Sequence, residues 1–413
     1  MLALRLARGA RPQVQLCRLL VAAASAGTGL LLLCTLGYAL AHPDAPAGSV
    51  LRLVWCAVPM AATVYLAVSV ARTDPGTRPR SGLAAIGLGP VRLMALSAVT
   101  TALSTALGSL LALLAFLHLR GDLPWTPFGG TAAGFLAADV PLPLPAALTL
   151  LTLAPLAASA ASALTLRPKE AEGRRTARRG QAPAGSGGDD APEDLAAALS
   201  DDVVSDLAPA AGPAPGGLPW GVAAIAAGLA VEAHASGSGG ALRFRLPGGV
   251  AGGPAGVLVG WALTALGLAL VGPALAYLCG RLLEAVRPGA VRLLAGRGLQ
   301  REAARIGRPL GVVCAVASGA YAMTAPYAGA RLSFGPLTTL GALVVVGCAL
   351  TTLVTAAIEA RRARAETVAA LVRLGAPATL LRSAALLRAG ALALVFAPLT
   401  WAVAELAAMP LRG

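Results

Sequence analysis

The sequence predicts an all-α, polytopic integral membrane protein with about nine transmembrane helices in two repeated halves. The composition, the spacing of apolar stretches and a repeated order of segments lead to this prediction. The chain has 413 residues, of which 57% are hydrophobic and 13% are charged, and its mean hydropathy is +0.74. Soluble domains carry about 25% charged residues. A soluble enzyme of this length would therefore lack the polar residues needed to cover its surface.

Nine apolar stretches approach or exceed the roughly 20 residues that a spanning helix needs. They cover residues 19–41, 51–71, 93–117, 143–166, 218–233, 257–280, 309–330, 337–358 and 384–406. The fifth stretch is the shortest. The first ends in Ala39-Leu40-Ala41, which resembles a signal-peptide cleavage site. Its apolar core is too long for a signal peptide, so we interpret it as a retained span.

Basic residues gather on one side of these spans. If the N-terminus lies inside, 27 of the 33 basic residues fall on inside segments. The six on the outside are Arg52, Arg120, Arg243, Arg245, Arg331 and Arg412. By the positive-inside rule this predicts a multi-pass protein of the cell membrane with a cytoplasmic N-terminus. The net charge of +14 then reflects topology, and we expect no nucleic-acid partner.

Composition divides the chain into four parts. We expect a first transmembrane half at 1–166, a cytoplasmic disordered linker at 167–217, two connecting transmembrane helices at 218–283 and a second transmembrane half at 284–413. The linker begins with an arginine cluster at 174–179 and continues into an acidic part. Its acidic residues there are Asp189, Asp190, Glu193, Asp194, Asp201, Asp202 and Asp206.

The two halves resemble each other in the order of their segments. Residues 7–12 (Ala-Arg-Gly-Ala-Arg-Pro) precede the first span, and residues 304–309 (Ala-Arg-Ile-Gly-Arg-Pro) lead into the seventh. Residues 83–90 precede the third span as residues 368–376 precede the ninth. Repeats in one orientation imply a pseudo-two-fold axis along the membrane normal. The alternative is a chance match between helices rich in Ala, Leu and Gly.

An arginine-rich segment from Glu359 precedes the ninth span. Val368, Leu371 and Val372 recur at helical spacing, with charged residues between them. Leu374-Gly375 followed by Pro377 is typical of a helix end. The pattern predicts a short amphipathic helix at the inner membrane surface. It is either an interfacial helix anchored by arginines or a docking helix for a soluble partner.

This arrangement resembles the FtsX-like (MacB-type) ABC transporter permeases, in which the segment is the coupling helix that rests on the ATPase. The resemblance implies a permease subunit with no enzymatic site or cofactor of its own, embedded in membrane lipid, with ATP bound by an ABC ATPase subunit. It implies that docking is by Glu366, Leu371, Arg373, Leu374 and Gly375, and in the first half by Leu83, Leu88, Gly89 and Arg92.

The sequence departs from the family pattern in three respects. The first-half copy of the docking segment lacks the Glu, the usual tenth span is missing, and no outside loop is large enough for the ectodomain that many members carry. Docking by the first half and capture of a substrate outside the membrane are therefore less clearly implied.

Several kinds of chemistry lack a sequence signature. Lys169 is the sole lysine, so no GxxxxGK[ST] loop exists, and GxSxG and HExxH are also missing. A secondary carrier would place ionisable groups in mid-membrane, but Glu232, Glu359 and Glu405 lie near predicted span ends, where interfacial positions are expected. A secondary carrier, or a membrane scaffold without ATP coupling, is the alternative to the permease.

Three smaller patterns complete the sequence-based predictions. The spacing of His42, His118 and His234 does not define a metal site, and we expect none. The six cysteines occur singly in or beside apolar stretches, as buried small hydrophobic residues do. Gly252, Gly256 and Gly260 form a GxxxGxxxG run that allows close helix packing, either within the chain or in a homodimer.

Overall fold

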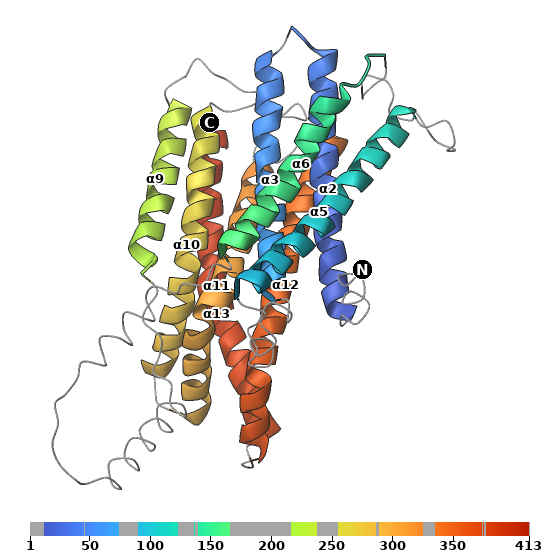
Figure 1. Ribbon diagram of the computed structural model, residues 1–413. Helices are drawn as coiled ribbons and strands as arrows, with labels where there is room; N and C mark the ends of the chain where they lie inside the picture. The colour runs from blue at the N-terminus through green and yellow to red at the C-terminus, as the bar shows by residue number, and fades with distance from the viewer. Residues whose placement is uncertain are drawn as a thin grey trace, which may run out of the picture.

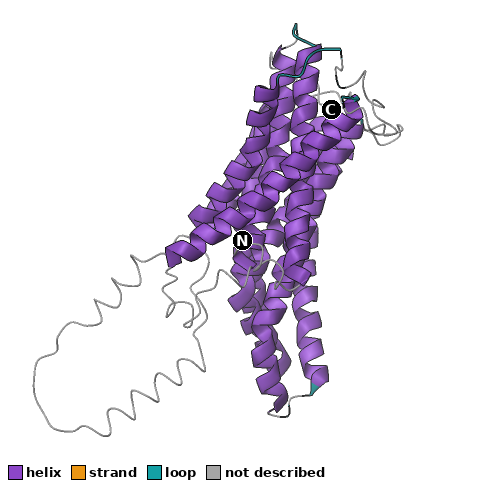
Figure 2. Ribbon diagram, turned by 45° about the vertical axis from the view of Figure 1, so that its right-hand side comes forward, coloured by secondary structure: helices purple, strands orange, loops and turns teal. Residues whose placement is uncertain are grey.

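The computed structural model describes nine helices and no strand within residues 12–44, 46–73, 90–122, 136, 139–165, 216–237, 255–285, 289–324, 335–373, 375 and 377–412. The helices are α2 (Pro12–Ala41), α3 (Pro46–Thr73), α5 (Pro90–Arg120), α6 (Leu144–Thr165), α9 (Leu218–Gly237), α10 (Ala255–Ala285), α11 (Ala290–Thr324), α12 (Pro336–Arg373) and α13 (Ala378–Arg412). Each contains one of the nine predicted spans, wholly or in large part. They form one elongated bundle (Figures 1 and 2).

All nine helices are long and apolar enough to cross a membrane. Large apolar side chains cover much of their outer surface, including Leu343, Leu386, Leu394 and Trp401, which are 66–78% exposed. Exposed apolar surface of this extent is unfavourable in water and is expected where lipid is the solvent. The prediction of an all-α, polytopic membrane protein is confirmed.

Local sequence explains where several helices begin and end. The helices α2, α3, α5 and α12 each begin with a proline, whose fixed φ suits the first helical turn and whose missing N–H has no partner there anyway. Two glycines with positive φ, Gly121 (93°) and Gly375 (86°), follow the ends of α5 and α12. Glycine adopts this left-handed conformation without the steric cost that a side chain brings.

The helices pack in two groups that share α12. In the first group α2 contacts α3, α5 and α6, and in the second α10 lies between α9 and α11, with α13 against α11. Helix α12 packs on α2 and α3 as well as on α11. Val344 and Cys348 of α12 are buried in a cluster with Val21 of α2 and Leu66 of α3. The second half of the chain is therefore joined to the first mainly through α12.

Packing within the two groups shows a parallel. Helix α2 contacts α5 and α3, and α11 likewise contacts α13 and α12. The Ser25 hydroxyl of α2 donates to the Thr105 carbonyl of α5 at 2.8 Å, and the Ser318 hydroxyl of α11 donates to the Thr400 carbonyl of α13 at 3.2 Å. The donors are 293 residues apart (25 and 318) and the acceptors 295 (105 and 400). The parallel supports the predicted repeat.

Glycines bring the helices of the second group into close contact. A Cβ on Gly260 of α10 would lie 2.7 Å from the Gly228 carbonyl oxygen of α9, and a Cβ on Gly256 would lie 2.6 Å from the Ala235 Cβ. Two glycines of the GxxxGxxxG run therefore serve packing within the chain, while Gly252 lies outside the described residues. The cysteines follow the prediction too, since five are buried and Cys17 is half-buried.

The structure differs from the sequence-based expectation at the eighth span. The stretch 337–358 and the amphipathic segment from Glu359 form one 38-residue helix, α12, rather than a span and a separate surface helix. No proline interrupts this stretch, and Ala, Arg and Glu, which favour helices, occupy the junction. At 1.5 Å per residue, the helix is about 57 Å long, which exceeds the roughly 30 Å of a bilayer core.

Candidate partner-docking site

Two helical hairpins extend the bundle at the end where the arginines gather, which we call the basic end. One is formed by the end of α10 and residues 290–308 of α11, and the other by residues 359–373 of α12 and the start of α13. Figures 1 and 2 show both at the lower end of the bundle, well below the start of α2. At 1.5 Å per residue, the 15-residue extension of α12 reaches about 22 Å beyond its predicted span.

The hairpin of α12 and α13 turns at Gly375. The Gly375 N–H donates to the Val372 carbonyl at 3.0 Å, and the Leu380 N–H donates to the Pro377 carbonyl at 3.1 Å as α13 begins. The positive φ of Gly375 reverses the chain within a few residues. The predicted helix end is therefore confirmed, although the helix that ends there is longer than expected.

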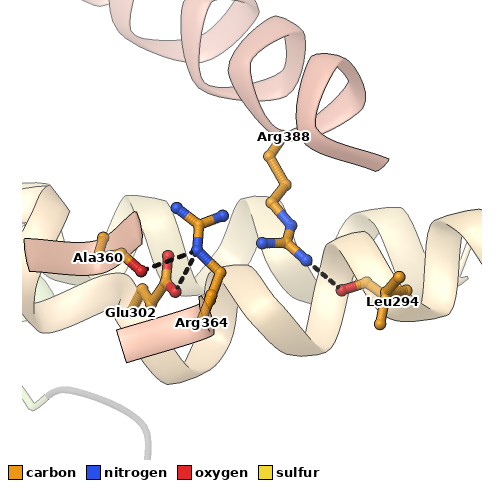
Figure 3. A network of polar contacts seen from close by, with 5 residues as sticks. All are labelled: Leu294, Glu302, Ala360, Arg364 and Arg388. Atoms are coloured by element: carbon orange, nitrogen blue, oxygen red, sulfur yellow. Dashed lines mark hydrogen bonds and ion pairs between the residues drawn. The ribbon is translucent and has the colours of Figure 1, made fainter. Parts of the chain in front are cut away.

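A polar network ties this hairpin to α11 (Figure 3). Arg364 Nε of α12 lies 2.9 Å from Glu302 Oε1 of α11 and donates to the Ala360 carbonyl at 3.0 Å. Arg388 Nη2 of α13 donates to the Leu294 carbonyl of α11 at 2.8 Å. The Glu302 side chain is only 9% exposed and that of Arg364 30%. Both α12 and α13 are thus fixed to α11 by charged groups with polar partners.

Sequence reasoning missed this network. Glu302 and Arg364 are 62 residues apart (302 and 364), and nothing in the sequence indicates that they meet. One signal is visible in retrospect, because Glu302 is the single acidic residue among the five arginines of residues 290–308. An isolated carboxylate in such a segment marks a place where positive charge has to be balanced inside the fold.

The predicted docking residues are placed only in part. Arg373 is exposed in the last turn of α12 and Gly375 is exposed at the turn. Glu366 and Leu371 lie within α12, but their side chains, like Leu374 as a whole, lie outside the described part of the chain.

In the first half, Arg92 is exposed in the first turn of α5, whereas Leu83, Leu88 and Gly89 lie outside the described residues. The structure therefore brings four predicted residues of the second half onto one hairpin. Of the first-half set, the structure describes Arg92 alone.

A second site lies between α9 and α10, where the sequence led us to expect an interfacial residue. Glu232 lies five residues before the end of α9 at Gly237 and is 1% exposed, so its side chain is enclosed between the two helices near the end of the span. The Thr264 hydroxyl donates to Glu232 Oε1 at 3.4 Å, and Glu232 Oε2 has no partner among the described residues. The position is buried because Gly228 and Gly260 bring the two helices close together around the side chain.

No protein-family model, no curated protein and no solved structure matches this chain. The fold itself defines the class. The protein is a multi-pass membrane protein whose described residues form nine apolar helices, with hairpins extended at its basic end.

Proposed function

We propose that this protein is the permease subunit of an ABC transporter, with its basic end in the cytoplasm of the cell and the ATPase bound to the α12–α13 hairpin. The ATPase supplies ATP binding and hydrolysis. This chain supplies the membrane path and converts a movement at the hairpin into a movement of its spans.

The continuity of α12 is the observation that carries the proposal. A partner bound at Arg373 and Gly375 would act on the end of a 38-residue helix that is continuous from Pro336 to Arg373. The other end of that helix packs on α2 and α3. A force at the tip is therefore transmitted to both groups of helices, as a coupling element requires.

The surface chemistry of the hairpin supports docking over burial in lipid. Val368 and Val372 are 38% and 52% exposed near the tip, and Arg361, Arg362 and Arg373 are exposed on the same helix. Apolar side chains set among arginines suit a protein interface with an acidic rim. The extension continues the span as part of one helix, whereas an interfacial helix would lie along the membrane plane.

Co-purification tests the proposal directly. The tagged chain is purified in detergent from its own host cell, and the product is tested for a bound Walker-type ATPase and, in nanodiscs, for ATP hydrolysis. We expect Leu371→Asp with Val372→Asp to reduce recovery of the ATPase at least tenfold. An Asp at the interface leaves a charge without a partner on binding.

Leu282→Asp is the matched control, because Leu282 is 59% exposed on the other hairpin at the same end. Unchanged ATPase recovery with a folded double variant would refute docking at the α12–α13 hairpin. Equal losses in the control would show that any charge at the basic end disturbs binding.

Glu232 favours a second candidate, a proton-coupled secondary carrier. An ionisable side chain buried within the spans, with one oxygen unpartnered, is a usual feature of proton pathways. Proton flux into vesicles that contain only this chain, abolished by Glu232→Gln, would support the carrier. Transport that needs the ATPase and survives Glu232→Gln would support the permease.

A further inference from the structure

Helix α11 carries four exposed arginines, Arg297, Arg301, Arg305 and Arg308, which we call the arginine stripe. We propose that the acidic segment of the linker, residues 189–206, docks on the arginine stripe within the same chain. The stripe is a surface of described residues, and the segment is its proposed occupant.

The arginine stripe is a single face of one helix. Spacings of four, four and three residues place the four side chains in a row about 16 Å long, and all four are exposed. The opposite face of α11 is buried, with Gly296 and Gly307 against α10. The stripe therefore points away from α10.

Glu302, on the neighbouring face, attracts Arg305 electrostatically but forms its ion pair with Arg364. None of the four stripe arginines has an ion pair among the described residues. Four guanidinium groups in a row raise a local positive potential that favours an anionic chain segment.

The linker carries the complementary charge. Residues 189–206 include seven carboxylates and no basic residue, and they are the most acidic part of the chain. Single exposed ion pairs are worth only about 0–1 kcal/mol. A tethered segment has an effective concentration in the millimolar range, so several weak pairs suffice to hold it.

The linker also rejoins the bundle close to the stripe. Gly217, before α9, abuts the Leu270 backbone of α10, and two residues along α10 Gly272 abuts the Gly307 backbone of α11. The end of the linker is thus level with Arg308 and separated from α11 by the width of α10. The separation is about 20 Å to the axis of α11 at the usual helix spacing, and the stripe, on the far face of α11, is about 5 Å further.

The chain between the acidic segment and the bundle is long enough for this distance. Asp206 precedes Gly216 by ten residues, which span up to about 33 Å when extended. Asp206 can therefore reach Arg305 and Arg308, and the carboxylates before it can follow the stripe toward the tip of the hairpin.

Occupancy of the stripe would change the electrostatics of the basic end. The bound segment would neutralise a face near the proposed ATPase site, so an acidic partner would have to displace it. This consequence rests on the proposed function, but the docking itself does not and can be tested without an ATPase.

Disulfide trapping in the isolated full chain, in nanodiscs of phosphatidylcholine, provides the test. Ser205→Cys lies in the acidic segment, and Ala304→Cys lies on exposed α11 within one turn of Arg301 and Arg308. This pair keeps all charges. We expect at least tenfold more cross-link than with Ser205→Cys and Ala363→Cys, a control at an exposed position on the α12 extension.

Removal of the negative charges of the linker shows whether the cross-link depends on charge or only on the length of the tether. Replacing the seven carboxylates of 189–206 with Asn or Gln should reduce the Ala304→Cys cross-link to the level of the control, and 1 M salt should do the same by screening. Single-cysteine variants report any reaction with native thiols, five of which are buried.

Two outcomes would overturn the inference. One is a cross-link of equal yield at both positions, or one that is insensitive to neutralisation. The other is shielding of Ala304→Cys from a water-soluble maleimide only in nanodiscs with anionic lipid, without any cross-link to Ser205→Cys. That result would assign the arginine stripe to lipid headgroups.

Discussion

Glu302 shows how a single residue fixes the geometry of the basic end. Its carboxylate is largely buried on α11 and meets Arg364 of α12 at 2.9 Å, beside the bond from Arg388 of α13 to the Leu294 carbonyl. Removal of a partner from a buried pair leaves the other charge uncompensated. The network therefore acts as a joint between three helices that are distant in sequence.

Glu302→Ala should lower the free energy of unfolding by about 1–3 kcal/mol, because Arg364 loses its carboxylate partner while the positive charge of Arg388 stays nearby. Thermal unfolding in detergent measures the change. Arg361→Ala, an exposed arginine one turn from Arg364, is the control and should change stability by less than about 0.5 kcal/mol. Equal effects of the two substitutions would contradict the role of the network.

Gly260→Ala should destabilise the contact between α9 and α10. The added Cβ would meet the Glu232 side chain and lie 2.7 Å from the Gly228 carbonyl oxygen, and backbone atoms cannot move aside without separating the helices. We expect a loss of at least about 2 kcal/mol. Gly347→Ala has nothing within 4 Å and should be neutral or slightly stabilising by helix propensity. A neutral Gly260→Ala would argue against this close approach.

At the scale of elements, α12 is the helix that most exceeds its sequence-based prediction. Hydropathy located its apolar part at 337–358 and the Gly375 turn located its end. Neither signal shows whether two adjoining helical segments are collinear. That depends on the absence of a breaking residue and on the contacts of α12 with α2, α3 and α11, which only the fold supplies.

The same reasoning explains which parts of the candidate site could be predicted. Gly375 was predictable because a glycine before Pro377 is a local signal. The Glu302–Arg364 pair was not, because the isolated Glu302 can be recognised in the sequence but its partner on another helix cannot. The burial of Glu232 was not predictable either, because it depends on Gly228 and Gly260, which lie on two different helices.

Ala363→Pro should separate the tip of α12 from its span. Proline removes a backbone hydrogen bond and clashes with the preceding turn, at a cost of about 3 kcal/mol in a helix interior. We expect faster hydrogen exchange in residues 364–373 with the spans intact, and an ATPase that still binds but no longer drives transport. Ala363→Ser keeps the helix and serves as control. Transport that persists despite faster exchange would show that α12 does not transmit the movement.

Gly375→Ala should strain the hairpin turn by about 1 kcal/mol, because a φ of 86° is unfavourable for a residue with a side chain. Space is not the cause, since nothing lies within 4 Å of the position. Gly390→Ala is equally unobstructed and lies within α13, so it isolates the effect of φ. Hydrogen exchange at the tip of the hairpin should rise in the first variant alone. Equal exchange in both would mean that the turn does not require a glycine.

At the scale of the whole molecule, the two groups of helices pack in a similar way but differ in the length of their helices at the basic end. Ser25 and Ser318 make corresponding bonds, from α2 to α5 and from α11 to α13. Among the described residues, however, the long extensions at the basic end belong to the second half, in α10–α11 and α12–α13. If the two halves are duplicated and only one is extended, a partner at the basic end would bind mainly to the extended half.

The predicted orientation of the molecule rests on the arginines at its basic end and is open to a direct test. Alkaline phosphatase, fused after Arg412 in a bacterial host, should be active, because α13 carries the chain from the basic end to the opposite end of the bundle. A green fluorescent protein inserted between Gly187 and Gly188 should fluoresce, because the linker joins helices α6 and α9 at the basic end, which the positive-inside rule assigns to the cytoplasm. The reverse pattern would place the arginine stripe and the α12–α13 hairpin outside the cell, where no ATP-driven partner could act on them.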